Sequence, residues 1–271
     1  DMECGEGYAR STLKLLGYQE KLMEAITSTG KPVIVIYIQG RPLNMNLAAE
    51  KAQALLTAWY PGEQGGAAIA DVLFGDYNPA GRLPVSIPRS EGQLHLFYSQ
   101  GEQRSYVEED GTPLYAFGYG LSYTQLDNSL LKLEKGNSPD ILLKVSCTIT
   151  NIGDRDGEEV VQLYICDKVA SVSQAPILLK GFRRIFLKKG ESKQVTFTLG
   201  KEELSLYNME MKQVVEPGEF KVMVGTASNE IRLDGEFTLP PNGDSSSTHK
   251  TVINKRKRLS KVTIISSFYH R

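Results

Sequence analysis

The residues that most often carry enzyme chemistry are few in this sequence and stand far apart. The three histidines are His95, His249 and His270. Their spacing fits neither a zinc site nor a triad in which a histidine activates a nucleophile. We expect His95 at the surface or at a junction between domains. The sequence therefore predicts neither a metal site nor histidine-based catalysis.

The three cysteines, Cys4, Cys147 and Cys166, do not form a disulfide framework or a metal-binding set. Cys147 and Cys166 fall on two predicted strands that we expect to pair as a hairpin around Asp154. In that register Cys147 lies opposite roughly Gln162, so a bond to Cys166 is not expected. We expect all three to be small buried hydrophobic residues.

Other features could bind a ligand, and each also has a structural interpretation. The loop Gly62 to Gly66 precedes a predicted helix, as an anion-binding loop does, but it lacks the Gly-Lys-Ser/Thr ending of a P-loop. Trp59 could offer its face to a sugar ring, and the aromatic residues between Tyr98 and Tyr123 could wall a cleft. We favour a structural loop, and packing for Trp59 and the aromatic residues.

Length and charge limit the classes of partner. The 271 residues suggest about two domains, with 41% hydrophobic and 23% charged residues. The first 244 residues hold 24 basic against 32 acidic residues, so this body is mildly acidic and predicts neither a nucleic-acid nor an anionic-membrane partner. The last 27 residues hold seven basic and no acidic ones. The cluster Lys255 to Arg258 could bind nucleic acid or direct localisation, but a solvated or non-native tail is the preferred interpretation.

The first hundred residues alternate between helical and apolar segments. Helical spacing covers 17–29, with Leu22, Met23 and Ile26 on one face. Further segments are a buried strand at 33–38, a short helix at 47–51, a second buried strand at 54–59, and a helix at 67–74 capped by Gly75. This order is typical of a parallel α/β layer. The apolar run at 33–38 is far too short to cross a bilayer, which takes about 20 residues.

Later segments follow different patterns. Residues 76–120 are rich in turns, and Pro79, Pro84 and Pro88 prevent a helix there. From about Leu130 the apolar residues alternate. Strands are expected at 143–150, 159–165, 178–187, 193–199, 218–224 and 231–239. Short strands at this spacing indicate a β-sandwich.

Several motifs, taken in order, resemble glycoside hydrolase family 3, the β-glucosidases and β-xylosidases. They are Gly30-Lys31-Pro32, Gly40-Arg41-Pro42-Leu43, Ala58-Trp59-Tyr60-Pro61-Gly62-Glu63-Gln64-Gly65-Gly66, Asn78-Pro79-Ala80-Gly81-Arg82-Leu83-Pro84, Phe117-Gly118-Tyr119-Gly120-Leu121-Ser122-Tyr123, Leu179-Lys180-Gly181-Phe182 and Glu216-Pro217-Gly218. Each short match is weak alone, but their shared order over roughly residues 1–239 is specific. The chain is thus identified as similar to the C-terminal part of this family.

The resemblance implies a (β/α)8 barrel, an α/β sandwich domain and a fibronectin-type-III-like domain in a complete enzyme. We assign 1–100 to a partial α/β sandwich domain, 101–129 to a junction, 130–239 to an all-β immunoglobulin- or fibronectin-III-like sandwich, and 240–271 to a basic, disordered tail. Asp1 is interpreted as a cut end, so the missing signal peptide says nothing about compartment. The sandwich should fold, whereas the first hundred residues should be poorly stable or associate.

The resemblance also implies a reaction. Family members cleave glycosidic bonds with retention, using a nucleophilic Asp on the barrel and, in many relatives, a Glu in a Gly-Glu-Gly-Tyr-Asp-Arg-like loop. Here Gly5-Glu6-Gly7-Tyr8-Ala9-Arg10 matches that loop, so Glu6 is the candidate general acid/base. Arg10 could orient the substrate. Ala9 departs from the usual Asp, and Glu6 could instead be an exposed carboxylate near a chain end.

Two hypotheses follow. The first is the C-terminal part of a retaining, exo-acting β-glucosidase or β-xylosidase. Its partners are a β-glycoside or oligosaccharide and the N-terminal barrel of the same polypeptide. It takes no metal or organic cofactor, and its expected location is extracytoplasmic, periplasmic or secreted. The second is a non-catalytic fragment that serves as a structural, interaction or weak carbohydrate-contacting module. Neither hypothesis includes nucleic acid or a membrane span, and the isolated chain is expected to be inactive.

Overall fold

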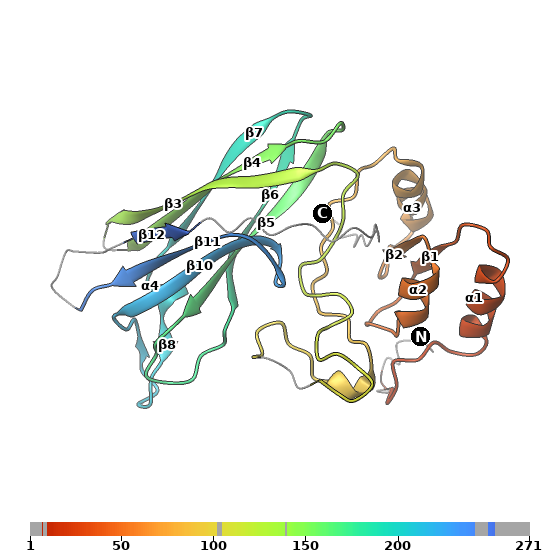
Figure 1. Ribbon diagram of the computed structural model, residues 1–271, viewed down its shortest axis with the longest axis horizontal. Coiled ribbons are helices and arrows are strands. Elements are labelled where there is room, and N and C mark those ends of the chain that lie inside the picture. Colours follow the sequence, from red (N-terminus) through yellow and green to blue (C-terminus); the bar gives the residue numbers. More distant parts are fainter. Residues whose placement is uncertain (1–6, 8–9, 102–104, 139, 242–248, 253–271) are drawn as a thin grey trace. The chain divides into compact units, whose positions relative to one another are not determined.

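The computed structural model describes residues 7, 10–101, 105–138, 140–241 and 249–252, the last range by its backbone only. These residues divide into two compact units (Figure 1). The first comprises residues up to 98 together with 105–123, and the second comprises 99–101, 124–241 and 249–252. The expected junction at 101–129 is therefore divided between the two units, mainly at Tyr123.

The first unit is built on two parallel strands. β1 (Ile34–Tyr37) pairs with β2 (Ala54–Thr57), and Ile34 lies beside Ala54. Helices α1 (Gln19–Thr27) and α2 (Asn46–Lys51) precede the two strands in turn, and α3 (Gly65–Phe74) follows them. The core consists of Met23, Tyr37, Leu43, Met45, Ala48, Leu55, Leu83 and Ile87. The predicted alternation of helices and strands is confirmed.

Helix α3 ends at the predicted residue. Gly75 has a φ of +86°, in the left-handed region that glycine adopts without strain. Its N–H donates to the carbonyl groups of Asp71 and Val72, which the end of the helix would otherwise leave unpaired. The helix begins at Gly65, two residues earlier than expected.

The prediction that β1 is buried is wrong for one of its faces. Ile34, Ile36 and Ile38 are 51%, 36% and 60% exposed. Within the described residues β1 pairs with β2 alone, so its other edge carries no neighbouring strand. A parallel sheet is normally covered on both faces, and this one is not.

The helical face predicted for α1 is also only partly buried. Met23 is buried, whereas Leu22 and Ile26 are exposed. Leu22 and Ile26 line an apolar groove together with Ile34, Ile36 and Ile38, and this α1–β1 groove runs between the helix and the strand. The sequence predicts the apolar face correctly, but it cannot show whether another segment covers it.

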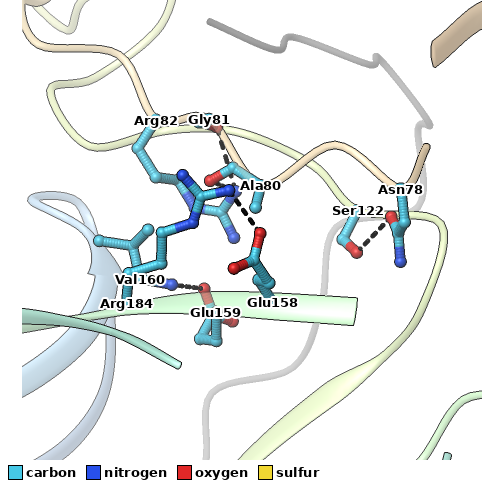
Figure 2. Close-up of polar contacts among 9 residues, drawn as sticks. All are labelled: Asn78, Ala80, Gly81, Arg82, Ser122, Glu158, Glu159, Val160 and Arg184. Atoms are coloured by element: carbon cyan, nitrogen blue, oxygen red, sulfur yellow. Dashed lines mark hydrogen bonds and ion pairs between the residues drawn. The ribbon is translucent and has the colours of Figure 1, made fainter. Parts of the chain in front are cut away.

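Residues 76–123 contain little regular structure, as predicted, but they are tightly bonded. Ile87 and Tyr115 form an isolated antiparallel bridge. The side-chain carbonyl of Asn78 accepts a 2.9 Å bond from the Ser122 hydroxyl (Figure 2) and a 2.8 Å bond from the Tyr123 N–H. The segment therefore folds back on itself, so that its last residues, Ser122 and Tyr123, lie beside Asn78 near its beginning.

The second unit is a sandwich of two antiparallel sheets (Figure 1). One sheet contains β3 (Leu126–Ser138), β4 (Ile141–Asn151) and β7 (Ser192–Leu199). The other has the order β12 (His249–Val252), β11 (Glu230–Leu239), β10 (Gly218–Ala227), β5 (Gly157–Asp167) and β6 (Leu178–Leu187). Inward-facing side chains of both sheets, such as Ile149, Leu163, Phe197, Val222 and Leu233, form one core. The predicted sandwich is confirmed.

Two smaller elements and the tail complete this unit. Helix α4 (Lys201–Leu204) and a short hairpin of β8 (Leu206–Tyr207) with β9 (Gln213–Val214) lie in sequence between β7 and β10. The range 240–271, expected as a tail, contributes β12, in which Thr251 pairs with Gly235 of β11.

The predicted hairpin around Asp154 is wrong. β4 pairs with β3 and β7, whereas β5 pairs with β10 and β6, so the connection crosses from one sheet to the other. Asn151 holds this crossing. Its amide nitrogen donates to the carbonyl groups of Arg155 at 2.7 Å and Leu187 at 3.2 Å. Neighbouring strands in the sequence often pair, but here β5 lies in the opposite sheet, and Asn151 satisfies polar groups at the crossing.

Candidate functional site

The predicted acid/base residue, Glu6, lies outside the described residues. Its neighbour Gly7 is described and exposed, with a φ of +75°. Residues other than glycine are strained in this conformation. The backbone at Gly7 thus gives a physical reason for a glycine directly after the candidate carboxyl.

Arg10, the predicted substrate-contacting residue, is half-buried. One guanidinium nitrogen, Nη2, lies 3.4 Å from the carbonyl oxygen of Lys14, to which it donates a long hydrogen bond. The Arg10 side chain therefore extends along the backbone toward Lys14. Arg10 and Gly7 belong to one segment of the chain, and Thr12 and Leu13 anchor the C-terminal end of that segment.

Thr12 and Leu13 are anchored by a carboxylate that the sequence analysis did not single out. Glu91 Oε1 accepts a 2.7 Å hydrogen bond from the Thr12 hydroxyl and a 2.8 Å bond from the Leu13 N–H. These partners are separated by 79 and 78 residues. Glu91 begins the 3₁₀ helix η1 (Glu91–Gln93). A single carboxylate oxygen therefore joins the segment after Glu6 to the turn-rich region.

Two further residues hold the carbonyl groups of the same dipeptide. Arg41 Nη2 donates to the carbonyl oxygen of Thr12 at 2.7 Å. The Asn44 N–H donates to the carbonyl oxygen of Leu13 at 2.7 Å. Leu13 itself is 7% exposed. Thr12 and Leu13 are thus held through two carbonyl groups, one N–H and one hydroxyl, and we name this arrangement the Glu91 clamp.

Hydrogen bonds on and beside η1 hold the helix that carries Glu91. Gln93 is buried, and its amide nitrogen donates to the carbonyl groups of Asp110 at 3.0 Å and Thr112 at 3.1 Å. Its side-chain oxygen accepts a 2.7 Å bond from the Arg89 N–H. Directly before η1, the Ser90 hydroxyl donates to the Glu109 carboxylate at 2.8 Å. These bonds fix the helix that presents Glu91.

The clamp also changes the acidity of Glu91. The Leu13 N–H, followed by the Thr12 hydroxyl, lowers the pKa of the Glu91 carboxyl below its ordinary value. Both groups donate to the ionised form and so stabilise it. No local motif could have revealed this residue, because its partners lie at the opposite end of the unit's sequence.

The aromatic candidates pack. Trp59 is partly buried against the core of the first unit, as predicted. Its indole N–H is buried and has no hydrogen-bond acceptor among the described residues. In the loop, Tyr98 stacks on Phe117 with ring centroids 4.3 Å apart, and Tyr115 stacks on Tyr119 at 5.4 Å. These contacts support the packing interpretation over a sugar-binding surface.

The remaining candidates carry no site in the part of the chain that the structure describes. His95 is exposed and lies beside Phe97 with ring centroids 6.0 Å apart. Within the described ranges, no group of three or more His, Cys, Asp or Glu side chains is arranged to hold a metal ion. Cys147 is buried and Cys166 is half-buried, and both are free thiols. None of the described helices has the length and apolar character needed to cross a membrane.

Comparison with known sequences matches both units. The profile of the glycosyl hydrolase family 3 C-terminal domain covers residues 1–123, and that of a fibronectin type III-like domain covers residues 159–228. A β-xylosidase of Formosa agariphila is 46% identical over 83% of this chain and 32% of its own length. A periplasmic β-glucosidase of Salmonella typhimurium is 40% identical over 86% of this chain and 32% of its own length.

Solved structures give the same result. A β-glucosidase from Erythrobacter marinus matches with a TM-score of 0.81 and 43% identity, over 86% of this chain and 31% of the other. A β-glucosidase from Listeria innocua, solved in complex with glucose, matches with a TM-score of 0.82 and 35% identity, over 88% of this chain and 35% of the other. The chain spans about a third of the length of these relatives. With its α/β unit and its sandwich matched in the family's order, the chain belongs to glycoside hydrolase family 3, as the C-terminal part.

Proposed function

We propose that this chain supplies the C-terminal part of a retaining, exo-acting β-glycosidase that removes terminal β-linked glucose or xylose. The observation that carries the proposal is the similarity to a β-xylosidase and a β-glucosidase, at 46% and 40% identity over 83% and 86% of the chain. The loop Gly5-Glu6-Gly7-Tyr8-Ala9-Arg10 provides a candidate for one of the two carboxyl groups that the reaction needs.

The proposed reaction uses one carboxyl group from this chain and one from outside it. An Asp of the N-terminal barrel attacks the anomeric carbon, while protonated Glu6 gives its proton to the leaving oxygen. The resulting glycosyl-enzyme is hydrolysed by a water molecule that Glu6, now ionised, deprotonates. The two displacements retain the β configuration. For this chemistry the two carboxyl groups must lie about 5–5.5 Å apart.

Arg10 is the proposed substrate-binding residue of this loop. It lies four residues after Glu6, and a guanidinium carries several N–H donors. Its long bond to the Lys14 carbonyl is therefore compatible with a further bond to a sugar hydroxyl.

The α1–β1 groove supports the proposed covalent partner. Ile34, Ile36 and Ile38 expose an apolar face that a parallel α/β sheet normally covers. We propose that the part of the polypeptide preceding this chain supplies the covering elements, together with the barrel that carries the nucleophile. The exposed groove is thus an interior surface of the whole enzyme.

The test is a substitution at Glu6 in the polypeptide that joins the barrel to this chain. Glu6→Gln should lower kcat/KM for substrates with poor leaving groups by about 10²- to 10⁴-fold, the usual contribution of general acid catalysis. For 2,4-dinitrophenyl glycosides, whose leaving group needs no proton, kcat/KM should change little. The control is Glu24→Gln, which removes an exposed carboxylate from α1. Equal kinetics for both variants would exclude Glu6 as the acid/base.

The alternative is a non-catalytic module. The chain on its own has no barrel nucleophile in the proposed scheme, so we expect no hydrolysis of aryl β-glycosides by the 271 residues alone. Turnover by the isolated chain that Glu6→Gln abolishes would contradict this expectation. A chain that stays inactive after joining to the barrel would favour the non-catalytic role.

We also propose an extracytoplasmic location. The Salmonella typhimurium relative is a periplasmic β-glucosidase, with 40% identity to this chain. Fractionation of the source cells with an antibody against the second unit tests the location, and recovery solely with cytoplasmic markers would contradict it.

A further inference from the structure

Glu91 binds the chain a few residues after the candidate acid/base residue, Glu6. The clamp fixes Thr12 and Leu13, six and seven residues after Glu6. A six-residue segment can reach about 20 Å when extended, so a tether at Thr12 decides which part of space the preceding loop can occupy. Without the bonds to Glu91, the position of Thr12 would be less restricted, and so would that of the loop that precedes it.

We propose that Glu91 is a positioning residue for the acid/base loop: its carboxylate fixes the Thr12–Leu13 end of the segment that carries Glu6. The proposal rests on the proposed role of Glu6 and adds the residue through which that role depends on the turn-rich region. Glu91 does not touch substrate in this scheme. It acts by limiting where the loop can lie.

The geometry favours positioning over general packing. Both donors of the clamp converge on one oxygen, Oε1, and hydrogen bonds to an ionised carboxylate are stronger than neutral ones. Gln93 and the Asn44 backbone hold the two sides of the clamp independently, so the rest of the unit can survive the loss of Glu91. Catalytic geometry is sensitive to such a change, since a misplacement of about 1 Å can cost about 10²-fold in rate.

Three substitutions distinguish a loss of the clamp from a loss of the fold. Glu91→Leu removes both acceptor bonds, whereas Glu91→Gln keeps an oxygen that can accept them without the charge. Thr12→Val removes one donor and leaves Glu91 in place. Glu50→Leu is the control, because Glu50 is an exposed carboxylate in the same unit and pairs only with its neighbour Lys51 among the ion pairs described.

The first measurement is amide hydrogen exchange in the 271-residue chain. Exchange at the Leu13 N–H should rise about tenfold or more in Glu91→Leu, less in Thr12→Val and Glu91→Gln, and not in Glu50→Leu. Exchange at Leu55, in the core strand β2, should stay unchanged and so verifies that the unit is folded. Unchanged protection at Leu13 in a folded Glu91→Leu variant would overturn the clamp.

The second measurement is leaving-group dependence in the polypeptide joined to its barrel. In Glu91→Leu, kcat/KM for methyl glycosides should fall about 10²-fold and that for 2,4-dinitrophenyl glycosides by much less, with partial recovery in Glu91→Gln. A merely structural role would lower both values equally, and that result would overturn the proposal. If Glu6→Gln shows no leaving-group dependence, the proposed function fails, whereas the exchange result at Leu13 still decides whether the clamp exists.

Discussion

The side-chain oxygen of Asn151 accepts a 2.7 Å hydrogen bond from the hydroxyl of Thr124, and both side chains are buried in the second unit. Thr124 lies just before β3, and Asn151 ends β4. The same amide group also accepts from the Gly153 N–H at 3.1 Å and donates to the carbonyl groups of Arg155 and Leu187. One buried side chain thus satisfies the polar groups of a crossing between two sheets.

Asn151→Ala should destabilise the sandwich by about 3 kcal/mol or more, because it leaves several buried donors and acceptors without partners. Thr150→Ala is the control. Its hydroxyl bonds to Ser192 at the surface, so the expected loss is below about 1 kcal/mol. Urea unfolding followed by far-UV circular dichroism reports mainly on the sandwich, while the fluorescence of the single tryptophan, Trp59, reports on the first unit. Equal losses in the two variants would contradict the anchor.

Cys147 should be less reactive than Cys166, the other described thiol, in the native chain. Burial raises its pKa to about 11, so only about one in a thousand Cys147 side chains is ionised to the thiolate at pH 8. Burial also raises the pKa of Cys166, but this side chain is only half-buried. In a Cys4→Ser background, iodoacetamide should therefore modify Cys166 first and Cys147 only after unfolding. Equal labelling of the two thiols in the folded chain would contradict the burial of Cys147.

The order of helices and strands can be predicted from local sequence patterns, but which strands pair with one another cannot. Gly75 ends α3 where the sequence predicts, because a left-handed cap is a local property. Adjacent strands such as β4 and β5 are expected to pair, yet these two lie in different sheets. At the crossing Asn151 bonds to Thr124 and Leu187, which are 27 and 36 residues away.

The same limit applies to the candidate site. Gly7 and Arg10 can be identified from one short motif, whereas Glu91 acquires its role only through contacts across 78 residues. A strand's exposure is also not local. Ile34 and Ile36 are predicted to be buried because they are apolar, but the described residues leave the face of β1 on which they lie partly uncovered.

The α1–β1 groove should make the isolated chain associate. Replacing both Ile34 and Ile38 with Lys adds charge to an exposed apolar face and should shift the chain toward the monomer in sedimentation velocity. Val107→Lys is the control, since Val107 is fully exposed and lies outside the groove. A wild-type chain that is monomeric at all concentrations, or a control with the same effect, would argue against the groove as an adhesive surface.

The Glu91 clamp should depend on pH. The pKa of Glu91 is lowered in the folded chain, chiefly by the Leu13 N–H, so its contribution to stability is present above the usual Glu pKa of about 4.3. That contribution is lost as the pH falls through the lower pKa of the folded state. Protection of the Leu13 amide, corrected for intrinsic exchange, should be constant at neutral pH and fall below about pH 4. Glu91→Gln should show no such fall, and identical profiles would contradict the ionised clamp.

The most direct test of the proposed function is the product that azide gives with Glu6→Gln in the polypeptide joined to its barrel. Azide needs no general base, so it should attack the glycosyl-enzyme formed from a 2,4-dinitrophenyl glycoside, restore turnover and release the β-glycosyl azide. The β configuration would show two displacements at the anomeric carbon, and the rescue would identify Glu6 as the acid/base. No rescue, or an α-glycosyl azide, would contradict this account.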